Sequence, residues 1–153
     1  MSDAVRTSAK AIVVQHDRIL LIKHVDENGS WYGLPGGGQE HGETLEEAVR
    51  RECLEEVGVQ VRIGRLLFVR DYIGKHHEFA EEDRNAHQVE VMFDCELSDG
   101  AEATLGSAPD PTQVGIAWFH LQDLPRLRLY PKVLALLLTD GLPDDGAYLG
   151  DVN

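Results

Sequence analysis

The sequence predicts a single α/β domain in which helices cover the faces of a central mixed β-sheet. Short aliphatic and β-branched runs, typical of strands, alternate irregularly with two stretches of helical pattern. The 153 residues are the length of one domain, long enough to bury a single core. Hydrophobic residues make up 42% and charged residues 27%, as in globular proteins. Disorder is therefore expected only in short flexible tails at the N- and C-terminus.

The chain opens with a predicted β-hairpin. Residues 11–14 and 19–22 are aliphatic and β-branched, and the polar residues 15–18 separate them. A turn cluster follows at 26–30, and then the glycine run 36–38. Glycines let backbone groups approach a ligand closely, and a glycine-rich turn before a helix suits an anion. No Gly-Lys-Ser/Thr follows the run, so it is not a Walker loop.

The clearest helix spans residues 44–57. Thr44 and Glu47 have the spacing of a capping box, in which each side chain bonds the backbone N–H of the other residue. Gly58 stands where the end of a helix favours a residue that tolerates positive φ.

The second half of the chain contains the remaining elements. Strands are expected over 59–72 (bent near Gly64), 88–97 and 115–121, a turn-rich segment over 101–113, and a sheet-packed helix over 129–138. Residues 73–86 form a polar loop of a length that is usually functional.

Three glutamates of the first helix lie at or beside positions that should be apolar. At 100° per residue, an apolar stripe is formed by Leu45, Ala48, Val49 and Cys53. Glu52 and Glu56 fall within this stripe, and Glu55 lies beside it. Partly buried carboxylates spaced i, i+3 and i+4 repel one another, so they either hold protons more tightly or recruit a cation. Mg²⁺ binds carboxylate oxygens readily, which indicates a metal site; a solvated acidic helix face is the alternative.

Residues 37–59 resemble the Nudix box. All seven fixed positions of that motif match: Gly37, Glu43, Arg51, Glu52, Glu55, Glu56 and Gly58. The preceding residues 34–37 resemble the usual lead-in of the family. Cys53 stands where the family usually has an aliphatic residue, and cysteine behaves as a small hydrophobe. The resemblance implies the Nudix-type α/β/α sandwich with a central mixed β-sheet.

The resemblance also implies a role for each matched residue. Glu52, Glu55 and Glu56 correspond to carboxylates that hold Mg²⁺ or Mn²⁺, and the backbone carbonyl of Gly36 or Gly37 is a further candidate ligand. The remaining matched positions are structural: Glu43 and Arg51 as a brace of the loop and helix, Gly37 in the loop, and Gly58 as the helix stop.

The implied activity is hydrolysis of a diphosphate linkage in a nucleoside diphosphate derivative, with water activated by the bound metal. Glu52 or Glu55 is the preferred candidate for the general base. Other acids stay open as alternatives: Glu78, Glu81, Glu82 and Asp83 of the polar loop, and Glu90 of the following strand.

Substrate recognition is expected outside the box. The candidate substrate-binding residues are Tyr32, Arg70, Tyr72, Phe79 and Gln88. Asp110, Pro111 and Gln113 are expected to form another wall of the cleft. Aromatic rings can stack on a nucleobase, whereas guanidinium and amide groups can contact phosphate or ribose. An isolated aromatic residue is more often part of the core, and a lone arginine is more often solvated.

Charge and cysteine content narrow the classes of partner. The formal net charge is -13, from 27 acids and 14 bases, which disfavours nucleic acid and anionic membranes and requires cations for any phosphate chemistry. Residues 1–10 lack the apolar region of a signal peptide, and the apolar run 133–138 is too short to span a bilayer. A cytoplasmic protein is expected. Cys53 and Cys95 make neither a disulfide framework nor a zinc site.

Three other functions compete with this interpretation. A non-catalytic nucleotide-binding regulator of the same family usually loses a box glutamate, and none is lost here. An RNA 5′ pyrophosphohydrolase would favour a basic track beside the site. An isoprenoid diphosphate isomerase would need a reactive cysteine in the cleft, and both cysteines lie in apolar patterns. The small phosphorylated substrate stays unspecified, and a homodimer is a further expectation from the family.

Overall fold

The computed structural model describes residues 3–106 and 111–153, and within them eight strands form one mixed β-sheet. The strands are β1 (Arg6–Gln15), β2 (Arg18–Asp26), β3 (Gly29–Gly33), β4 (Gly36–Gly38), β5 (Val61–Ile73), β6 (His87–Leu97), β7 (Gln113–His120) and β8 (Ala147–Asp151). The main path runs β3-β2-β1-β6-β5-β8, while β4 pairs with β1 and β7 with β2. The pairs β1/β6 and β5/β8 are parallel and the others antiparallel, so the predicted mixed sheet is confirmed.

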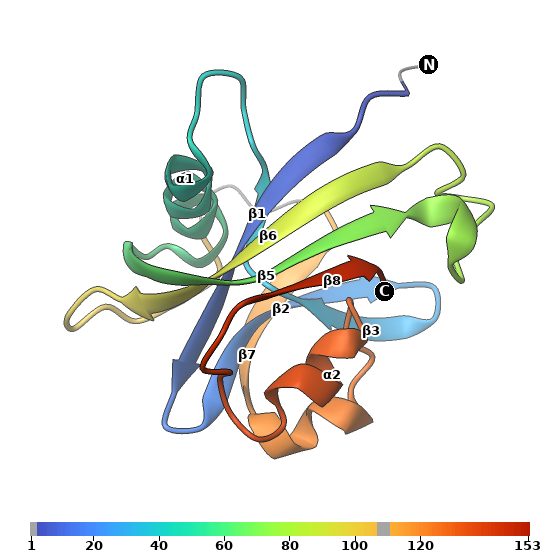
Figure 1. Cartoon of the computed structure of the whole chain (residues 1–153). Helices are drawn as coiled ribbons and strands as arrows, with labels where there is room; N and C mark the ends of the chain where they lie inside the picture. Colours follow the sequence, from blue (N-terminus) through green and yellow to red (C-terminus); the bar gives the residue numbers. More distant parts are fainter. Residues whose placement is uncertain (1–2, 107–110) are drawn as a thin grey trace.

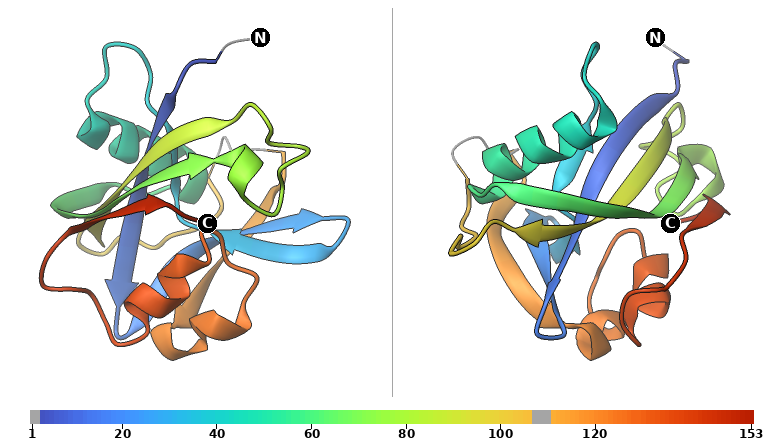
Figure 2. Two further views of the ribbon diagram at one scale, coloured as in Figure 1. Left: turned by 45° about the vertical axis from the view of Figure 1, so that its right-hand side comes forward. Right: turned by 60° about the vertical axis from the view of Figure 1, so that its left-hand side comes forward.

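Helices cover both faces of the sheet, as predicted (Figures 1 and 2). Helix α1 (Leu45–Val57) packs on one face, and the short helix α2 (Val133–Leu138) lies on the other with the 3-10 helix η2 (Leu121–Arg126). A third short helix, η1 (Gly74–His76), follows β5.

The core has two layers, because successive side chains of β1 and β2 point to opposite faces of the sheet. Ala9, Ala11, Val13, Leu20 and Ile22 face α1, whereas Ile12, Ile19 and Leu21 face η2 and α2. Each of these side chains is at most 1% exposed. Strands buried on both faces read as continuous aliphatic runs, which explains why the hairpin was visible in the sequence.

Helix α1 begins and ends as its sequence predicts. The Glu47 N–H donates to Thr44 Oγ1 over 3.1 Å, which is one of the two expected capping bonds. Gly58 ends the helix with φ of 68°, and its N–H donates to the carbonyl of Leu54. Local signals at both ends therefore fix the residues at which α1 begins and ends.

Three sequence predictions are corrected. The glycine run is strand β4, antiparallel to β1, rather than a plain turn. The predicted helix 129–138 begins only at Val133, because Leu129 and Tyr130 instead pair with Tyr32 and the following Pro131 disfavours a helical residue before it.

The flexible C-terminal tail is the third incorrect prediction. Residues 147–151 form β8, which runs parallel to β5 at the edge of the sheet. The Val152 N–H then donates to the carbonyl of Asp71 over 3.2 Å. Pairing with a distant strand, which local sequence does not reveal, orders this segment.

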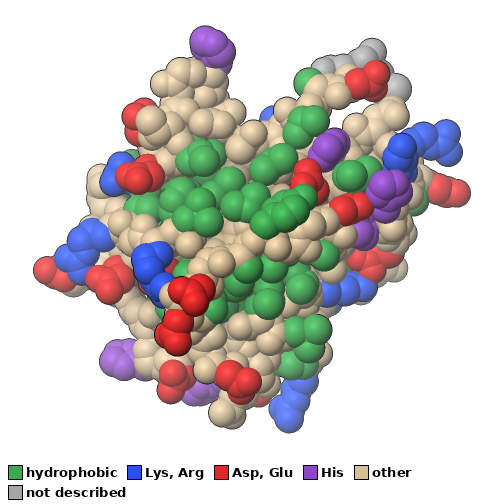
Figure 3. All heavy atoms as spheres, in the orientation of Figure 1, with side chains coloured by type: hydrophobic (Ala, Val, Ile, Leu, Met, Phe, Trp, Pro, Cys, Tyr) green, Lys and Arg blue, Asp and Glu red, His purple; other side chains and the backbone are tan. Residues whose placement is uncertain are grey.

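No helix in the described ranges has the length and apolar character needed to cross a bilayer. On the face shown in Figure 3, acidic side chains are spread over the surface rather than collected in one patch.

Candidate functional site

Helix α1 carries carboxylates on its buried face, as the helical wheel indicates. Ala48, Val49, Cys53 and Val57 of this face are fully buried against the sheet. Glu56 is only 3% exposed, and the Glu52 side chain is 17% exposed. Glu55, at the edge of the stripe, has a side chain that is 41% exposed. The helix therefore presents a graded row of acids from the core to the solvent.

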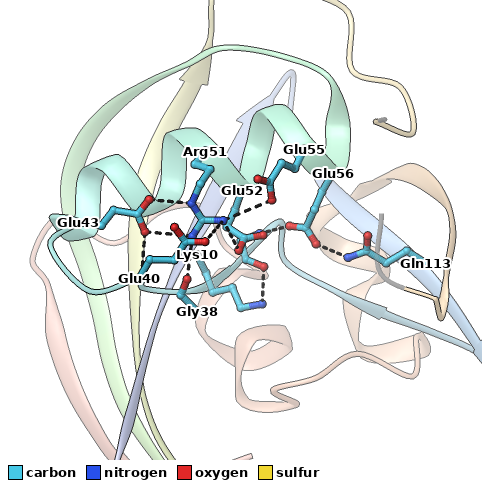
Figure 4. Close-up of polar contacts among 10 residues, drawn as sticks. Lys10, Gly38, Glu40, Glu43, Arg51, Glu52, Glu55, Glu56 and Gln113 are labelled. Carbon is cyan, nitrogen blue, oxygen red and sulfur yellow. Dashed lines mark hydrogen bonds and ion pairs between the residues drawn. The ribbon is translucent and has the colours of Figure 1, made fainter. Parts of the chain in front are cut away.

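Arg51 joins the preceding loop to this row (Figure 4). Its Nε and Nη2 donate to the two carboxylate oxygens of Glu43 over 2.7 and 3.0 Å, and Nη2 also donates to the carbonyl of Gly38 over 2.9 Å. Its Nη1 lies 3.0 Å from Glu52 Oε1 and 3.3 Å from Glu55 Oε2. The guanidinium holds the pKa of Glu43 below its usual value. The two residues expected to brace the loop are thus in direct contact.

Glu56 is held from two sides. Its Oε1 accepts a hydrogen bond from the Gly36 N–H over 2.7 Å, and its Oε2 accepts one from the side-chain amide of Gln113. Burial raises the pKa of Glu56, while the Lys10 ammonium and these two hydrogen bonds act in the opposite direction. Two donors and a nearby cation thus make this buried carboxylate tolerable in the core.

The glycines of β4 leave the space that the carboxylates occupy. A Cβ at Gly37 would lie 2.7 Å from Oε1 of Glu52, and a Cβ at Gly36 would lie 2.2 Å from the carbonyl oxygen of Ala9. Gly36 also has φ of 132°, which side chains rarely tolerate. Burial raises the pKa of Glu52, and the Arg51 guanidinium opposes that shift.

The donor set of the glutamate row fits a hard divalent cation. Glu52, Glu55 and Glu56 offer carboxylate oxygens, the ligands that Mg²⁺ and Mn²⁺ prefer. The raised pKa of the two more buried acids shows that positive charge would be stabilising there. Within 3–106 and 111–153, no three acidic, imidazole or thiol side chains are already gathered to hold an ion, and Arg51 contacts two of the three glutamates.

A cavity of about 470 Å³ adjoins the glutamate row, a size typical of sites for small molecules. At the end nearest α1 it is lined by Lys10, Gly36, Glu56 and Gln113. Residues of β5 and β6 and a set of aromatic rings line the remainder. A ligand in this cavity would therefore touch the buried end of the glutamate row.

Two cross-strand pairs of β5 and β6 supply the polar part of the cavity. Arg70 pairs with Glu90 and Tyr72 with Gln88, and residues two apart in a strand share one face. Arg70 Nε lies 3.1 Å from Glu90 Oε1, with both side chains 8% exposed. The Tyr72 hydroxyl donates to Asp83 of the following loop over 2.7 Å.

Aromatic rings supply another wall of the cavity. Trp31 stacks on His24 with centroids 3.9 Å apart and planes inclined by 7°. Tyr130 meets Trp31 edge-on at 5.8 Å and Phe79 at 5.4 Å. Such a group of rings offers both faces and edges to a planar ligand.

Most of the candidate substrate residues meet in this cavity. Arg70, Tyr72, Phe79 and Gln88 line it. Tyr32 is not among the lining residues: its ring packs edge-on against Phe119 at 4.9 Å, against the core beneath η2 and α2.

Of the residues expected to form another wall, Gln113 lines the cavity and Asp110 lies outside the described residues. Thr112, which was not predicted, also lines it. Of the alternative bases, Asp83 and Glu90 border the cavity, and both are already engaged by partners.

Sequence reasoning missed several lining residues, among them Lys10, His24, Arg128 and Tyr130. Only Lys10 left a signal, because a lysine between the buried Ala9 and Ala11 is unusual in a β-strand core. The others come from segments that pair only in three dimensions.

Neither cysteine belongs to the site. Cys53 and Cys95 are buried in the core between α1 and the sheet. Burial raises the pKa of both thiols, that of Cys95 to about 12. An isomerase that relies on a reactive cysteine in the cleft is therefore not supported.

A row of acids on α1 thus adjoins a polar and aromatic cavity. The model of the NUDIX domain matches residues 5–137, so the chain belongs to the Nudix family.

Individual relatives give the same result. The chain is 32% identical over 129 residues to the nucleoside triphosphatase NudI of Enterobacter sp. (strain 638), covering 81% of this chain and 88% of that protein. It is 33% identical over 119 residues to the ADP-ribose pyrophosphatase of Methanocaldococcus jannaschii, covering 76% and 62%. The crystal structure of a MutT NUDIX hydrolase from Burkholderia pseudomallei has a TM-score of 0.67, 30% identity, and coverage of 87% and 96%. Some curated relatives are longer, and the chain spans 31% of their length.

Proposed function

We propose that this chain is a metal-dependent hydrolase that cleaves a diphosphate linkage in a nucleoside diphosphate derivative. The observation that carries the proposal is the buried Glu56, which lies on the metal-binding candidate helix and also lines the cavity. One residue thus links the expected cation site to the expected substrate site. The names of the relatives, a nucleoside triphosphatase and an ADP-ribose pyrophosphatase, support the same class of reaction.

Glu52, Glu55 and Glu56 would hold Mg²⁺ or Mn²⁺, with the carbonyl of Gly36 as a further ligand. A cation bound there supplies charge neutralisation of the diphosphate and lowers the pKa of an attacking water. Arg51 contacts both Glu52 and Glu55, and these two are more exposed than Glu56, so one of them would accept the proton of the water.

The cavity supports a substrate with a planar ring and a charged or hydroxylated part. The rings of Trp31, Tyr130 and Phe79 suit a nucleobase, and Arg70 with Gln88 suits ribose or phosphate oxygens. Homodimer formation and a cytoplasmic location stay predictions.

Assays with Mg²⁺ and a panel of substrates test the proposal. The panel comprises nucleoside triphosphates, ADP-ribose, other nucleotide sugars, dinucleoside polyphosphates and 5′-triphosphorylated RNA. Loss of the buried ligand in Glu56→Gln should lower kcat for the preferred class by about a hundredfold or more, as for other lost metal partners. Glu47→Gln, on the exposed side of the same helix, is the matched control and should keep wild-type activity.

Turnover of a single class by the wild type and the control, but not by Glu56→Gln, would name the substrate class. If no substrate is hydrolysed while nucleotides still bind, the enzyme proposal fails and a regulatory binding module takes its place.

A further inference from the structure

Lys10 brings a positive charge from the sheet to the glutamate row of α1. It lies on β1, directly opposite Gly36 of β4 in the antiparallel register, and it lines the cavity. Its Nζ donates to the carbonyl oxygen of Gly36 over 3.1 Å. In Figure 4 the Lys10 side chain lies below the glutamate row, and a dashed line joins its nitrogen to an oxygen atom.

The partners of Lys10 differ from those of the other cations in the cavity. Arg70 is paired with Glu90, and Arg128 makes two bonds to Asp26 over 2.8 and 2.9 Å. Lys10 instead donates to a backbone carbonyl. Among the described residues that line the cavity, it is the lysine or arginine that forms no side-chain ion pair, and it contacts the residue whose N–H holds Glu56.

Gly36 connects Lys10 to the most buried glutamate. The N–H of Gly36 donates to Glu56, and its carbonyl accepts from Lys10, so the ammonium and the carboxylate bind opposite ends of one residue. Lys10 thus binds the same glycine that holds the most buried carboxylate, and it binds the carbonyl that is a candidate cation ligand. The ammonium therefore contributes part of the positive charge that a divalent cation would contribute.

We infer that Lys10 is a positioning residue that sets the affinity of the site for a divalent cation, an inference that rests on the proposed function. Its ammonium would compete with the cation for the Gly36 carbonyl and for the negative charge of Glu52 and Glu56. Removing the charge should strengthen cation binding. It should also leave the buried acids poorly compensated whenever the cation dissociates. A lysine that served only to fill space would have neither effect.

Calorimetric titration of the full chain with Mn²⁺, without substrate, tests this role. Lys10→Met keeps the unbranched chain up to the ε position but removes the ammonium and its charge. It should bind Mn²⁺ about tenfold more tightly, the effect of deleting one unit charge a few ångströms from a divalent ion in a partly solvated site. Lys10→Arg keeps the charge and should resemble the wild type. Lys23→Met, on the neighbouring strand β2 and not among the lining residues, is the control for the change in net charge.

Thermal unfolding gives a second readout that does not depend on turnover. In EDTA, Lys10→Met should unfold at a lower temperature than the wild type, and saturating Mn²⁺ should remove the difference. Lys10→Gln, which still offers a donor to the Gly36 carbonyl, replaces Lys10→Met if the latter does not fold.

Unchanged or weaker Mn²⁺ binding in the neutral variants would overturn the inference, and so would an equal loss of Tm with and without Mn²⁺. The proposed function fails separately. That failure would be seen as a wild type that does not bind Mn²⁺, or as binding that Glu56→Gln leaves unaltered.

Discussion

Single residues of β4 show how closely the backbone approaches the glutamate row. A Cβ added to Gly37 would meet both carboxylate oxygens of Glu52, at 2.7 and 2.9 Å. A Cβ added to Gly38, the next residue, would meet only the terminal nitrogen of Arg6, at 3.4 Å. The two glycines have the same local chemistry and differ only in their neighbours, so they form a natural pair for mutagenesis.

We expect Gly37→Ala to displace the Glu52 carboxylate and to lower both Mn²⁺ affinity and kcat by about tenfold to a hundredfold, the range seen when the surroundings of a metal ligand change. Gly38→Ala should stay within about twofold of the wild type, because the flexible end of Arg6 can shift. Kinetics and Mn²⁺ titration of the two variants, with circular dichroism to verify folding, measure the difference. Equal losses in both would show that the loop, and not the space at Gly37, matters.

The stability of the metal-free chain should also depend on Glu56. Burial raises its pKa in the folded chain, so its stabilising contribution is complete below the pKa of the unfolded chain and is lost as the pH rises through the folded value. In EDTA, at a pH where the Glu56 carboxyl of the folded chain is ionised, Glu56→Gln should therefore be more stable than the wild type. Acidification should close the gap. Urea unfolding at several pH values tests this, and a less stable variant at that pH would contradict it.

At the scale of elements, α1 and the loop before it act as one unit. Arg51 contacts the loop through Glu43 and Gly38 and the helix through Glu52 and Glu55. Its planar guanidinium forms these bonds in several directions at once, which the single ammonium of a lysine cannot do. The orientation of the glutamate row thus depends on a residue that does not line the cavity.

Arg51→Lys is expected to lower kcat by about tenfold or more while the chain remains folded, since the loop loses its bidentate bond and Glu52 is less well oriented. Arg50→Lys is the matched control, because Arg50 is exposed and its ion pair is with the exposed Glu46. Steady-state kinetics of both variants beside thermal unfolding measure the effect. A control as impaired as Arg51→Lys would argue against the brace.

The bounds and buried faces of some elements could be predicted from the sequence, and those of others could not. The caps and the periodicity of α1 are local, so its bounds and the burial of Glu52 and Glu56 could be predicted. Tyr32 could not be placed, because neighbouring residues of a strand face opposite sides and only the pairing of β3 decides that Trp31 faces the cavity. The start of α2 was misjudged because Leu129 pairs with Tyr32.

On the scale of the whole molecule, the net charge of -13 determines which phosphorylated compounds can approach. Acidic side chains are spread over the visible surface in Figure 3. A long polyanion meets this field over its whole length, whereas a small nucleotide meets mainly the cavity. Repulsion between the chain and a polyanion weakens as salt shortens the screening length.

We therefore expect kcat/KM for 5′-triphosphorylated RNA to be at least about tenfold below that for the preferred small substrate at low salt. The kcat/KM for RNA divided by that for the small substrate should rise as KCl increases from about 0.05 to about 0.3 M, because screening weakens the repulsion between the chain and the RNA. Assays at saturating Mg²⁺ over this range measure it. A ratio that falls with salt would indicate a basic track for RNA and would revive the RNA pyrophosphohydrolase alternative.

The glutamates and the Nudix box could be found without a structure, because helix periodicity, caps and motif spacing are local features of consecutive residues, and the alternation of strand and helix patterns indicated the fold class. The cavity could be found only from the folded chain. Lys10, Trp31, Arg70 and Tyr130 come from segments far apart in the chain, and long-range strand pairing brings them together. The spacing of residues along the chain does not reveal these contacts, because they depend on the order of the strands in the sheet and on the register of their pairing.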